Sequence, residues 1–383
     1  MKAIINGRIV LPNAVKMGKA LLYDEKIVAV TGTEEARAAA DEIIDAQNAY
    51  VCPGLIDVHI HGYMNADVSD GDRAGVITMA EGVAKNGVTA FLPTTMTIPW
   101  NEIETALGVV RDLMPESRKK GWKGAEILGA HAEGPFINKN KKGAQPESAI
   151  LPPDIQRILP WKDVIRLITA APEVEGGMKF LRDMREQTNI TVSIGHTDAT
   201  YEEAVAAMHA GADHVTHTFN AQTGLLHRKP GVVGAALTEN VYTELIPDTF
   251  HVHPAIFRLM TAAKGDHLVL ITDCLRSCGM PDGKYTLGGQ TIILKGIECR
   301  LEDGTIAGSV LKLNKGVKNL RDYASIPMHE AVYAASLAPA RSIKVDDRKG
   351  SLETGKDADI VLMNDDCDVL RTILRGETIY TAK

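Results

Sequence analysis

The sequence is poor in cysteine and lacks the features of a secreted or membrane protein. Its five cysteines are odd in number and include no Cys-x-x-Cys pair, which argues against a disulfide framework or a structural zinc ribbon. No apolar run approaches the roughly 18 residues of a membrane span. Residues 1–7 have the pattern of a strand and turn rather than of a signal peptide. We therefore expect a soluble protein of the reducing cytoplasm, with no membrane partner.

Clusters of basic residues are also missing. The net charge is −7 over 383 residues, and no run of lysine or arginine interrupts the mildly acidic balance, so we expect no nucleic-acid partner. An anionic substrate would need a local basic site. The length suits a TIM barrel of roughly 250 residues with a smaller domain beside it.

Eight apolar segments alternate with helical ones, which is typical of a parallel α/β fold. The expected strands are 55–61, 89–94, 126–133, 165–171, 191–196, 214–219, 242–248 and 268–273. The expected helices are 73–86, 101–120, 177–188, 200–210, 254–264, 311–324 and 328–337. Eight strands favour a closed (β/α)8 barrel over an open sheet. The long connections 138–153 and 278–306, the second with a hairpin-like pattern, are expected to be lids or binding loops.

Metal-binding residue types recur where the expected strands end. His59 and His61 are two apart on a strand, so their imidazoles point to the same side and suit a divalent metal. A lone His-x-His pair is more often structural. Four further strand ends carry His131 with Glu133, His196, His217 and Asp273. Because the carboxyl ends of barrel strands form one mouth, this convergence predicts a metal site there.

Several motifs resemble the N-acetylglucosamine-6-phosphate deacetylase family, a branch of the amidohydrolase superfamily. They are Pro-Gly-Leu-Ile-Asp-Val-His-Ile-His-Gly at 53–62, His-Ala-Glu-Gly-Pro-Phe at 131–136, Gly-His-Thr-Asp-Ala at 195–199, His-Thr-Phe-Asn-Ala at 217–221, Arg-Lys-Pro-Gly at 228–231 and Ala-Gly-Ser at 307–309. The resemblance implies a metal-dependent TIM barrel over 53–345. It also implies a small β-sandwich domain built from both chain ends, 1–52 and 346–383, where short strands and tight turns recur.

The same resemblance implies the ligand set. Glu133, His196 and His217 would hold the main metal, and His59 and His61 a second one. Family members differ at the second pair, so the resemblance does not decide whether one or two ions bind. Nitrogen and carboxylate donors do not choose among zinc, which we favour, and iron, manganese or nickel. His131 and His214 are expected to be structural or to support the ligands.

The implied reaction removes the acetyl group of N-acetylglucosamine-6-phosphate. Asp273 would be the catalytic residue that accepts the water proton and delivers it to the departing amine. Arg228 would reach the phosphate from the neighbouring subunit of a homodimer, because its planar fork of donors suits phosphate. The expected substrate-binding residues are Ala144, Gln145, Asn220, Ala221, Arg228, His251, Ile306, Ala307, Gly308 and Ser309.

The chain departs from the family pattern at the mouth. Gln145 stands where many members have histidine, Thr249 where glycine is common, and Cys274-Leu275-Arg276-Ser277 follows Asp273. These changes leave an epimeric substrate open, such as the galactosamine or mannosamine derivative. A different amidohydrolase is a further alternative, against which Arg228 and the Asn220-Ala221 pair argue. A non-catalytic assembly subunit is disfavoured because the apparent ligand set is complete.

Overall fold

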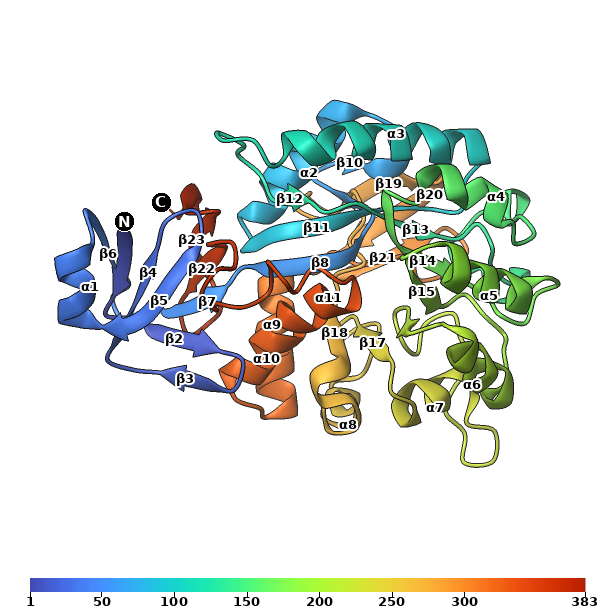
Figure 1. Ribbon diagram of the computed structural model, residues 1–383. Coiled ribbons are helices and arrows are strands. Elements are labelled where there is room, and N and C mark those ends of the chain that lie inside the picture. The colour runs from blue at the N-terminus through green and yellow to red at the C-terminus, as the bar shows by residue number, and fades with distance from the viewer. Residues whose placement is uncertain (383) are drawn as a thin grey trace.

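The computed structural model describes residues 1–382, and its centre is a parallel barrel (Figure 1). The barrel strands are β8 (Leu55–Ile60), β11 (Val88–Thr95), β12 (Glu126–Ile127) with β13 (Ala130–Glu133), β14 (Ile165–Ala170), β15 (Thr191–Ile194), β16 (His214–Val215), β17 (Tyr242–Leu245) and β18 (Leu268–Leu270). Each pairs in parallel with the next. A bridge between Ile60 and Cys274 closes the ring. The predicted (β/α)8 barrel is therefore confirmed.

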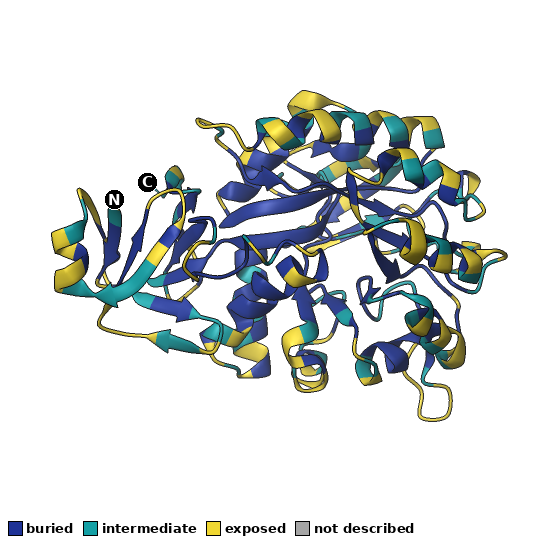
Figure 2. Cartoon of the chain, viewed as in Figure 1, coloured by how far each residue is buried: buried dark blue, intermediate teal, exposed yellow. Residues whose placement is uncertain are grey.

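Helices surround the barrel, with their buried sides toward the strands and their exposed sides outward (Figures 1 and 2). They are α2 (Arg73–Ala84), α3 (Trp100–Glu116), α4 (Ile155–Ile158), α5 (Gly177–Gln187), α6 (Tyr201–Ala210), α7 (Gly231–Thr238), α8 (Pro254–Lys264), α9 (Leu313–Ala324), α10 (Met328–Ala334) and α11 (Leu337–Ser342). Within residues 1–382, no helix combines the length and the apolarity needed to cross a membrane.

The helices differ from the sequence-based expectation in several places, among them the unpredicted single turn α4 and the end of α3 at Glu116 rather than at 120. The expected helix 328–337 is divided into α10 and α11, which are separated at Ala335 and Ser336. The helix α7 was not predicted, because its residues are apolar and mostly buried, so they have no amphipathic period. By contrast, α6 begins where expected, at a capping box in which the Thr200 side chain accepts from the Glu203 amide.

Both chain ends build a small two-sheet domain beside the barrel. One sheet has the order β5-β4-β1-β6 and the other the order β24-β23-β22-β7-β2-β3. Their bounds are β1 (Lys2–Ile5), β2 (Arg8–Leu11), β3 (Ala14–Lys16), β4 (Lys19–Tyr23), β5 (Ile27–Gly32), β6 (Glu42–Asp45), β7 (Tyr50–Pro53), β22 (Ile360–Met363), β23 (Val369–Leu374) and β24 (Glu377–Thr381), with α1 (Thr33–Ala39) beside them. Ile4, Leu21, Ile360 and Ile373 share one apolar cluster. The sandwich made from both termini is confirmed, and its limits at 52 and 346 stay a prediction.

The two long connections carry structure of their own. Residues 278–306 form an antiparallel sheet of β19 (Gly283–Leu287), β20 (Gln290–Lys295) and β21 (Glu298–Leu301), one strand more than a hairpin. Residues 138–153 contain two helical turns, η2 (Lys139–Lys141) and η3 (Glu147–Ala149). The remaining short elements are β9 (Gly62–Tyr63), β10 (Ala66–Asp67), η1 (Val68–Asp70), η4 (Leu159–Trp161) and η5 (Gly265–His267).

A buried ion cluster fastens the C-terminal segment to the barrel. Glu126 on β12 accepts hydrogen bonds from Arg348 at 2.8 Å, Lys349 at 2.8 Å and Arg375 at 2.7 Å. Lys349 is 1% exposed and also donates to Asp359 at 2.6 Å. Burial favours the neutral Glu126 carboxyl, but Lys349 and Arg348 outweigh it and hold its pKa at about 2.

Replacing Lys349 with methionine should remove the cation that Glu126 and Asp359 share, while Arg348 and Arg375 remain on Glu126. Because Glu126 and Asp359 would remain buried without their shared cation, we expect Lys349→Met to lower the free energy of unfolding by about 3–5 kcal/mol. Urea unfolding at neutral pH measures this loss. The exposed Lys179→Met is the control, expected to stay within about 0.5 kcal/mol.

The ion cluster also predicts a direction for acid unfolding. The pKa of Glu126 is lowered on folding from 4.5 to about 2, so its contribution is complete above the unfolded pKa and is lost as the pH falls through that interval. The free energy of unfolding should therefore fall less steeply with decreasing pH in Lys349→Met than in the wild type. Equal stability of the two proteins at neutral pH would contradict the role of Lys349.

Candidate metal centre and its cavity

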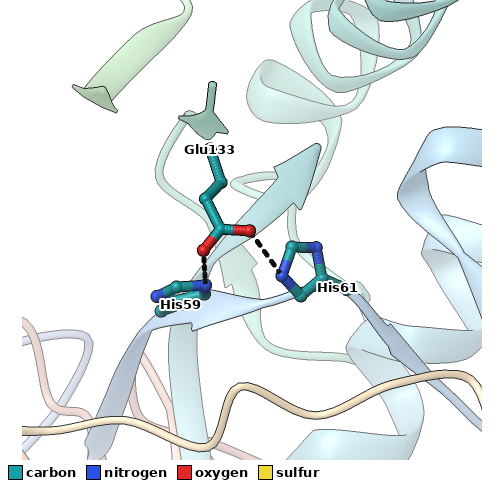
Figure 3. A group of neighbouring side chains, drawn as sticks. All are labelled: His59, His61 and Glu133. Atoms are coloured by element: carbon teal, nitrogen blue, oxygen red, sulfur yellow. Dashed lines mark ion pairs between the residues drawn. The ribbon is translucent and has the colours of Figure 1, made fainter. Parts of the chain in front are cut away.

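One carboxylate and four imidazoles meet at the carboxyl-terminal mouth of the barrel. Figure 3 shows Glu133 reaching His59 on β8 and His61 directly after that strand, with Oε1 3.4 Å from His59 Nε2 and Oε2 3.3 Å from His61 Nε2. The same Oε1 lies 3.1 Å from His196 Nε2 and 3.0 Å from His217 Nε2. Two candidate ligand groups therefore share Glu133, one with His59 and His61 and one with His196 and His217.

Hydrogen bonds at the outer nitrogens orient three of these imidazoles. The pairs are His59 Nδ1 with the Glu244 carboxylate at 3.0 Å, His61 Nδ1 with the Thr94 carbonyl at 3.1 Å and His196 Nδ1 with the Lys141 carbonyl at 2.9 Å. Since a carbonyl only accepts, Nδ1 of His61 and His196 carries a hydrogen, so Nε2 is the nitrogen that can offer a lone pair to a cation placed beside Glu133. His59 Nε2 is buried and has no hydrogen-bond partner. This donor set and its tautomers fit a divalent cation.

The electrostatics of the centre favour added positive charge. Burial lowers the pKa of His59, but the carboxylates of Glu244, Glu133 and Asp273 raise it well above its usual value. For His61, burial is likewise outweighed by Asp273 and Glu133, which raise its pKa to about 10. Three acids buried together need compensating charge. A divalent cation among these Nε2 atoms would supply it in place of protons.

Left-handed turns aim the side chains that follow the strands into the mouth. His196, His217 and Asp273 have φ values of 47°, 26° and 50°, a conformation that L-residues other than glycine seldom adopt. Such strain persists where the surrounding structure fixes it, and it is concentrated at functional sites.

Asp273 closes the barrel and faces the His59–His61 pair. Its amide donates to the His59 carbonyl at 2.9 Å, and its Oδ1 is 3.3 Å from His61 Nε2. The preceding Thr272 donates its hydroxyl to Asp57 at 2.6 Å. Asp57 was not singled out from the sequence, although an acid within an otherwise apolar buried strand was a signal for it.

A cavity of about 320 Å³ lies over the centre. Seven predicted substrate-binding residues line it: Ala144, Gln145, Asn220, Ala221, His251, Ile306 and Gly308. Six further lining residues were not predicted: Met96, Gly143, Phe219, Leu275, Leu287 and Thr305. Leu275 belongs to the divergent segment after Asp273, and Leu287 and Thr305 come from the long connection after β18.

Three predicted substrate-binding residues do not line this cavity. Ala307 and Ser309 are buried beside it, and the Ser309 amide donates to the Asp273 carbonyl at 2.7 Å. Arg228 is exposed, on the segment 222–230 that extends away from the barrel before α7 (Figure 1). The structure of one chain therefore does not bring Arg228 to its own cavity.

Gln145 is held between two groups of the site. Its Oε1 accepts from the Thr97 amide at 2.8 Å, which orients its Nε2 toward Glu133 Oε2 at 2.5 Å. Because a backbone amide only donates, this contact assigns the orientation of the side-chain amide. The glutamine therefore uses one of its two donor hydrogens on the central carboxylate.

The two other histidines lie deeper in the barrel. His131 Nε2 is 2.8 Å from the Thr169 hydroxyl, and His214 Nδ1 is 3.1 Å from the Ser193 hydroxyl. Burial lowers the pKa of both imidazoles. They are neutral members of a buried polar layer beside the candidate ligands.

A parallel barrel with histidines and a carboxylate at its carboxyl-terminal mouth defines a class, the barrels built to hold a hydrolytic metal centre. The chain belongs to the amidohydrolase family, whose model matches residues 50–379.

Relatives that match over most of the chain show which members of the family it resembles. The chain is 37% identical to N-acetylglucosamine-6-phosphate deacetylase of Bacillus subtilis (strain 168), over 96% of this chain and 94% of the relative. It is also 37% identical to N-acetylgalactosamine-6-phosphate deacetylase of Escherichia coli O157:H7, over 85% and 87%. The crystal structure of N-acetylglucosamine-6-phosphate deacetylase from Pasteurella multocida superposes with a TM-score of 0.93 at 32% identity, covering 100% of both chains.

Thr249 offers a test of strain at the mouth. It has a φ of 70°, which is costly for a β-branched residue but not for glycine. We expect Thr249→Gly to raise the free energy of unfolding by about 1 kcal/mol, the steric relief being partly offset by the extra entropy of unfolded glycine. Urea unfolding measures this change, with Thr105→Gly at an exposed position of α3 as the destabilising control. A loss of stability in Thr249→Gly would show that the threonine is not strained.

Proposed function

We propose that the protein hydrolyses N-acetylglucosamine-6-phosphate to glucosamine-6-phosphate and acetate. The observation that carries the proposal is the meeting of Glu133, His196 and His217 beneath a cavity that Asp273 and His251 also line. The similarity to deacetylases of this substrate over nearly the whole chain supports it.

The proposal includes one or two divalent ions per chain, with zinc as the first choice. Glu133, His196 and His217 would hold one ion, and His59 and His61, with Glu133 between the two sites, a second. Such an ion polarises an acyl oxygen and lowers the pKa of water. The protein would supply the fixed ligands, the enclosed site and the proton transfers.

Asp273 is the proposed general base and acid. Burial raises the pKa of its carboxyl, but His59 and His61 lower it below the ordinary value, so the carboxylate is ionised and able to accept a proton. It would take the proton of the attacking water as the oxygen bonds to the acetyl carbon. It would then give that proton to the amine nitrogen as the carbon–nitrogen bond breaks.

The sugar would lie among the other lining residues. Asp248 accepts from His251 Nδ1 at 2.6 Å, which leaves His251 Nε2 available to a substrate oxygen. The remaining proposed contacts are Asn220, Ala221, Ala144, Gln145 and the turn from Ile306 to Ser309. The cytoplasm is the proposed location, supported by five cysteines that are all buried and unpaired.

The phosphate contact requires a second chain in this proposal. The residues that line the cavity include no lysine or arginine, so a phosphate dianion would lack a cationic partner within one chain. Arg228 is exposed and follows Leu225 and Leu226, which are 45% and 62% exposed. A two-fold homodimer would bury these leucines and place Arg228 of each chain at the cavity of the other.

The galactosamine epimer is the second candidate substrate. The E. coli relative named for N-acetylgalactosamine-6-phosphate has the same 37% identity as the B. subtilis one, over 85% of this chain rather than 96%. Gln145 and Thr249 also differ from the pattern common in glucosamine-type enzymes. Both candidates are acetamides of an amino sugar phosphate, so the proposed chemistry is the same.

Acetate release from three sugars tests the function. We expect rapid release from N-acetylglucosamine-6-phosphate, slower release from the galactosamine epimer and little from unphosphorylated N-acetylglucosamine, using protein of measured metal content. Faster turnover of the galactosamine epimer would make it, rather than the glucosamine derivative, the first candidate substrate. No acetate from any sugar, with metal bound, would refute the deacetylase function.

Complementation tests Asp273 and Arg228 together. Asp273→Asn should retain its metal and lose about 10²–10⁴-fold in kcat, because an amide cannot accept the proton. Arg228→Ala should raise KM for the phosphorylated sugar. A mixture of the two variants, unfolded and refolded together, should recover activity, since a mixed dimer contains one site with both residues. Absence of recovery, with dimers shown by light scattering, would place both residues in the same chain's site.

A further inference from the structure

Glu244 is a buried carboxylate that contacts both halves of the candidate metal centre. It lies on β17 with 0% exposure. Its Oε2 accepts from His59 Nδ1 at 3.0 Å and from the His217 backbone amide at 2.8 Å. A single oxygen thus joins one ligand of each group. Taking a carboxylate out of water costs several kcal/mol, so its position needs an explanation.

The contact with His59 determines which ring nitrogen is available. An ionised carboxylate only accepts, so the hydrogen of His59 lies on Nδ1 and the lone pair lies on Nε2. That nitrogen faces Glu133 Oε1 at 3.4 Å and Asp273 Oδ1 at 3.6 Å. A carboxylate behind a histidine ligand fixes its tautomer and raises its basicity.

The contact with His217 acts on the backbone. The ring of His217 differs from the other three ligand rings, because its Nδ1 is buried and has no hydrogen-bond partner. The residue also has a strained φ of 26°. The bond from its amide to Glu244 therefore fixes the turn that aims the ring, in place of a hydrogen bond on the ring itself.

The other oxygen of Glu244 has no comparable partner. Oε1 is buried without a hydrogen bond, and the nearest histidine there, His214, is 3.7 Å away and bonded to Ser193 instead. The contacts of the Glu244 carboxylate are therefore concentrated on the two ligand residues. A role in fold stability alone does not explain that arrangement.

We propose that Glu244 is a positioning residue that prepares both metal sites, through the tautomer of His59 at one and the turn of His217 at the other. This rests on the proposed metal-dependent function. Its strongest effect falls on the His59–His61 site, because there Glu244 acts directly on a ligand ring.

Two substitutions separate the charge of Glu244 from its hydrogen bonds. Glu244→Gln retains an oxygen that can accept from His59 and His217 but removes the negative charge. Glu244→Met has a similar length and accepts neither bond. Ser193→Ala is the matched control, because it alters the same buried polar layer and its hydroxyl contacts His214 and Thr216 rather than a proposed ligand.

Zinc binding by the full-length, metal-stripped protein is the measurement. Each variant is titrated with zinc against a fluorescent chelator, and the two dissociation constants and the number of ions per chain are compared with wild type. Removing a residue that supports a metal ligand typically weakens metal binding about 10–100-fold. We expect Glu244→Gln to lose about tenfold at the weaker site alone. We expect Glu244→Met to lose about 100-fold there and a smaller factor at the tighter site.

The outcomes separate this inference from the proposed function. Thermal melting of the metal-free proteins identifies a variant that fails to fold. If Glu244→Met does not fold, the zinc affinities of Glu244→Gln alone test the role of Glu244. Wild-type affinities in folded Glu244 variants, or a wild-type protein that binds a single zinc ion, would overturn the role of Glu244 while leaving acetate release possible. A loss in Ser193→Ala as large as that in Glu244→Met would overturn it also. A wild-type protein that neither binds metal nor releases acetate would refute the proposed function itself.

Discussion

The site depends on a shared carboxylate, Glu133, which is enclosed by four imidazoles. Its Oε1 alone lies within 3.4 Å of three of them, those of His59, His196 and His217. An ionised acid in a 2% exposed position must be compensated by cations or donors. Gln145, fixed by the Thr97 amide, provides one donor on the Oε2 side. The remaining nitrogen lone pairs point inward, which is the geometry that favours a bound cation over an empty polar cavity.

Barrel closure makes this arrangement possible. The last strand joins the first through Asp273 and Cys274 rather than through a long ladder, so the residue proposed for proton transfer is itself part of the closure. Asp57 and Thr272 strengthen the same junction. Below it, threonine, serine and histidine side chains form a neutral polar layer, and beside that layer Glu244 contacts His59 and His217. The centre is therefore supported from the barrel interior as well as from its mouth.

Two parts of the proposed activity have different structural origins. Hydrolysis would use residues of one chain, all at strand ends, whereas recognition of the phosphate would need a cation that the cavity of one chain does not contain. Placing that cation on an exposed segment beside two exposed leucines would link substrate recognition to association of chains. The small terminal domain lies at the opposite end of the barrel strands, and the Glu126–Lys349 cluster attaches it there.

By itself the sequence predicted a parallel α/β barrel with a metal site at its mouth, because strand period and strand-end histidines are local properties that survive in a one-dimensional pattern. The sequence implied the terminal sandwich and the particular ligand set only through the resemblance of its motifs to a known family. It did not identify Glu244, Asp57 or the fixed orientation of Gln145. Nor did it show the short helix α7, which is buried on most sides and has no amphipathic period. Only the tertiary structure decided these features. Hydrogen bonds between strands distant in sequence, such as that from His59 to Glu244, depend on barrel register and side-chain direction, and no local pattern of residues encodes either.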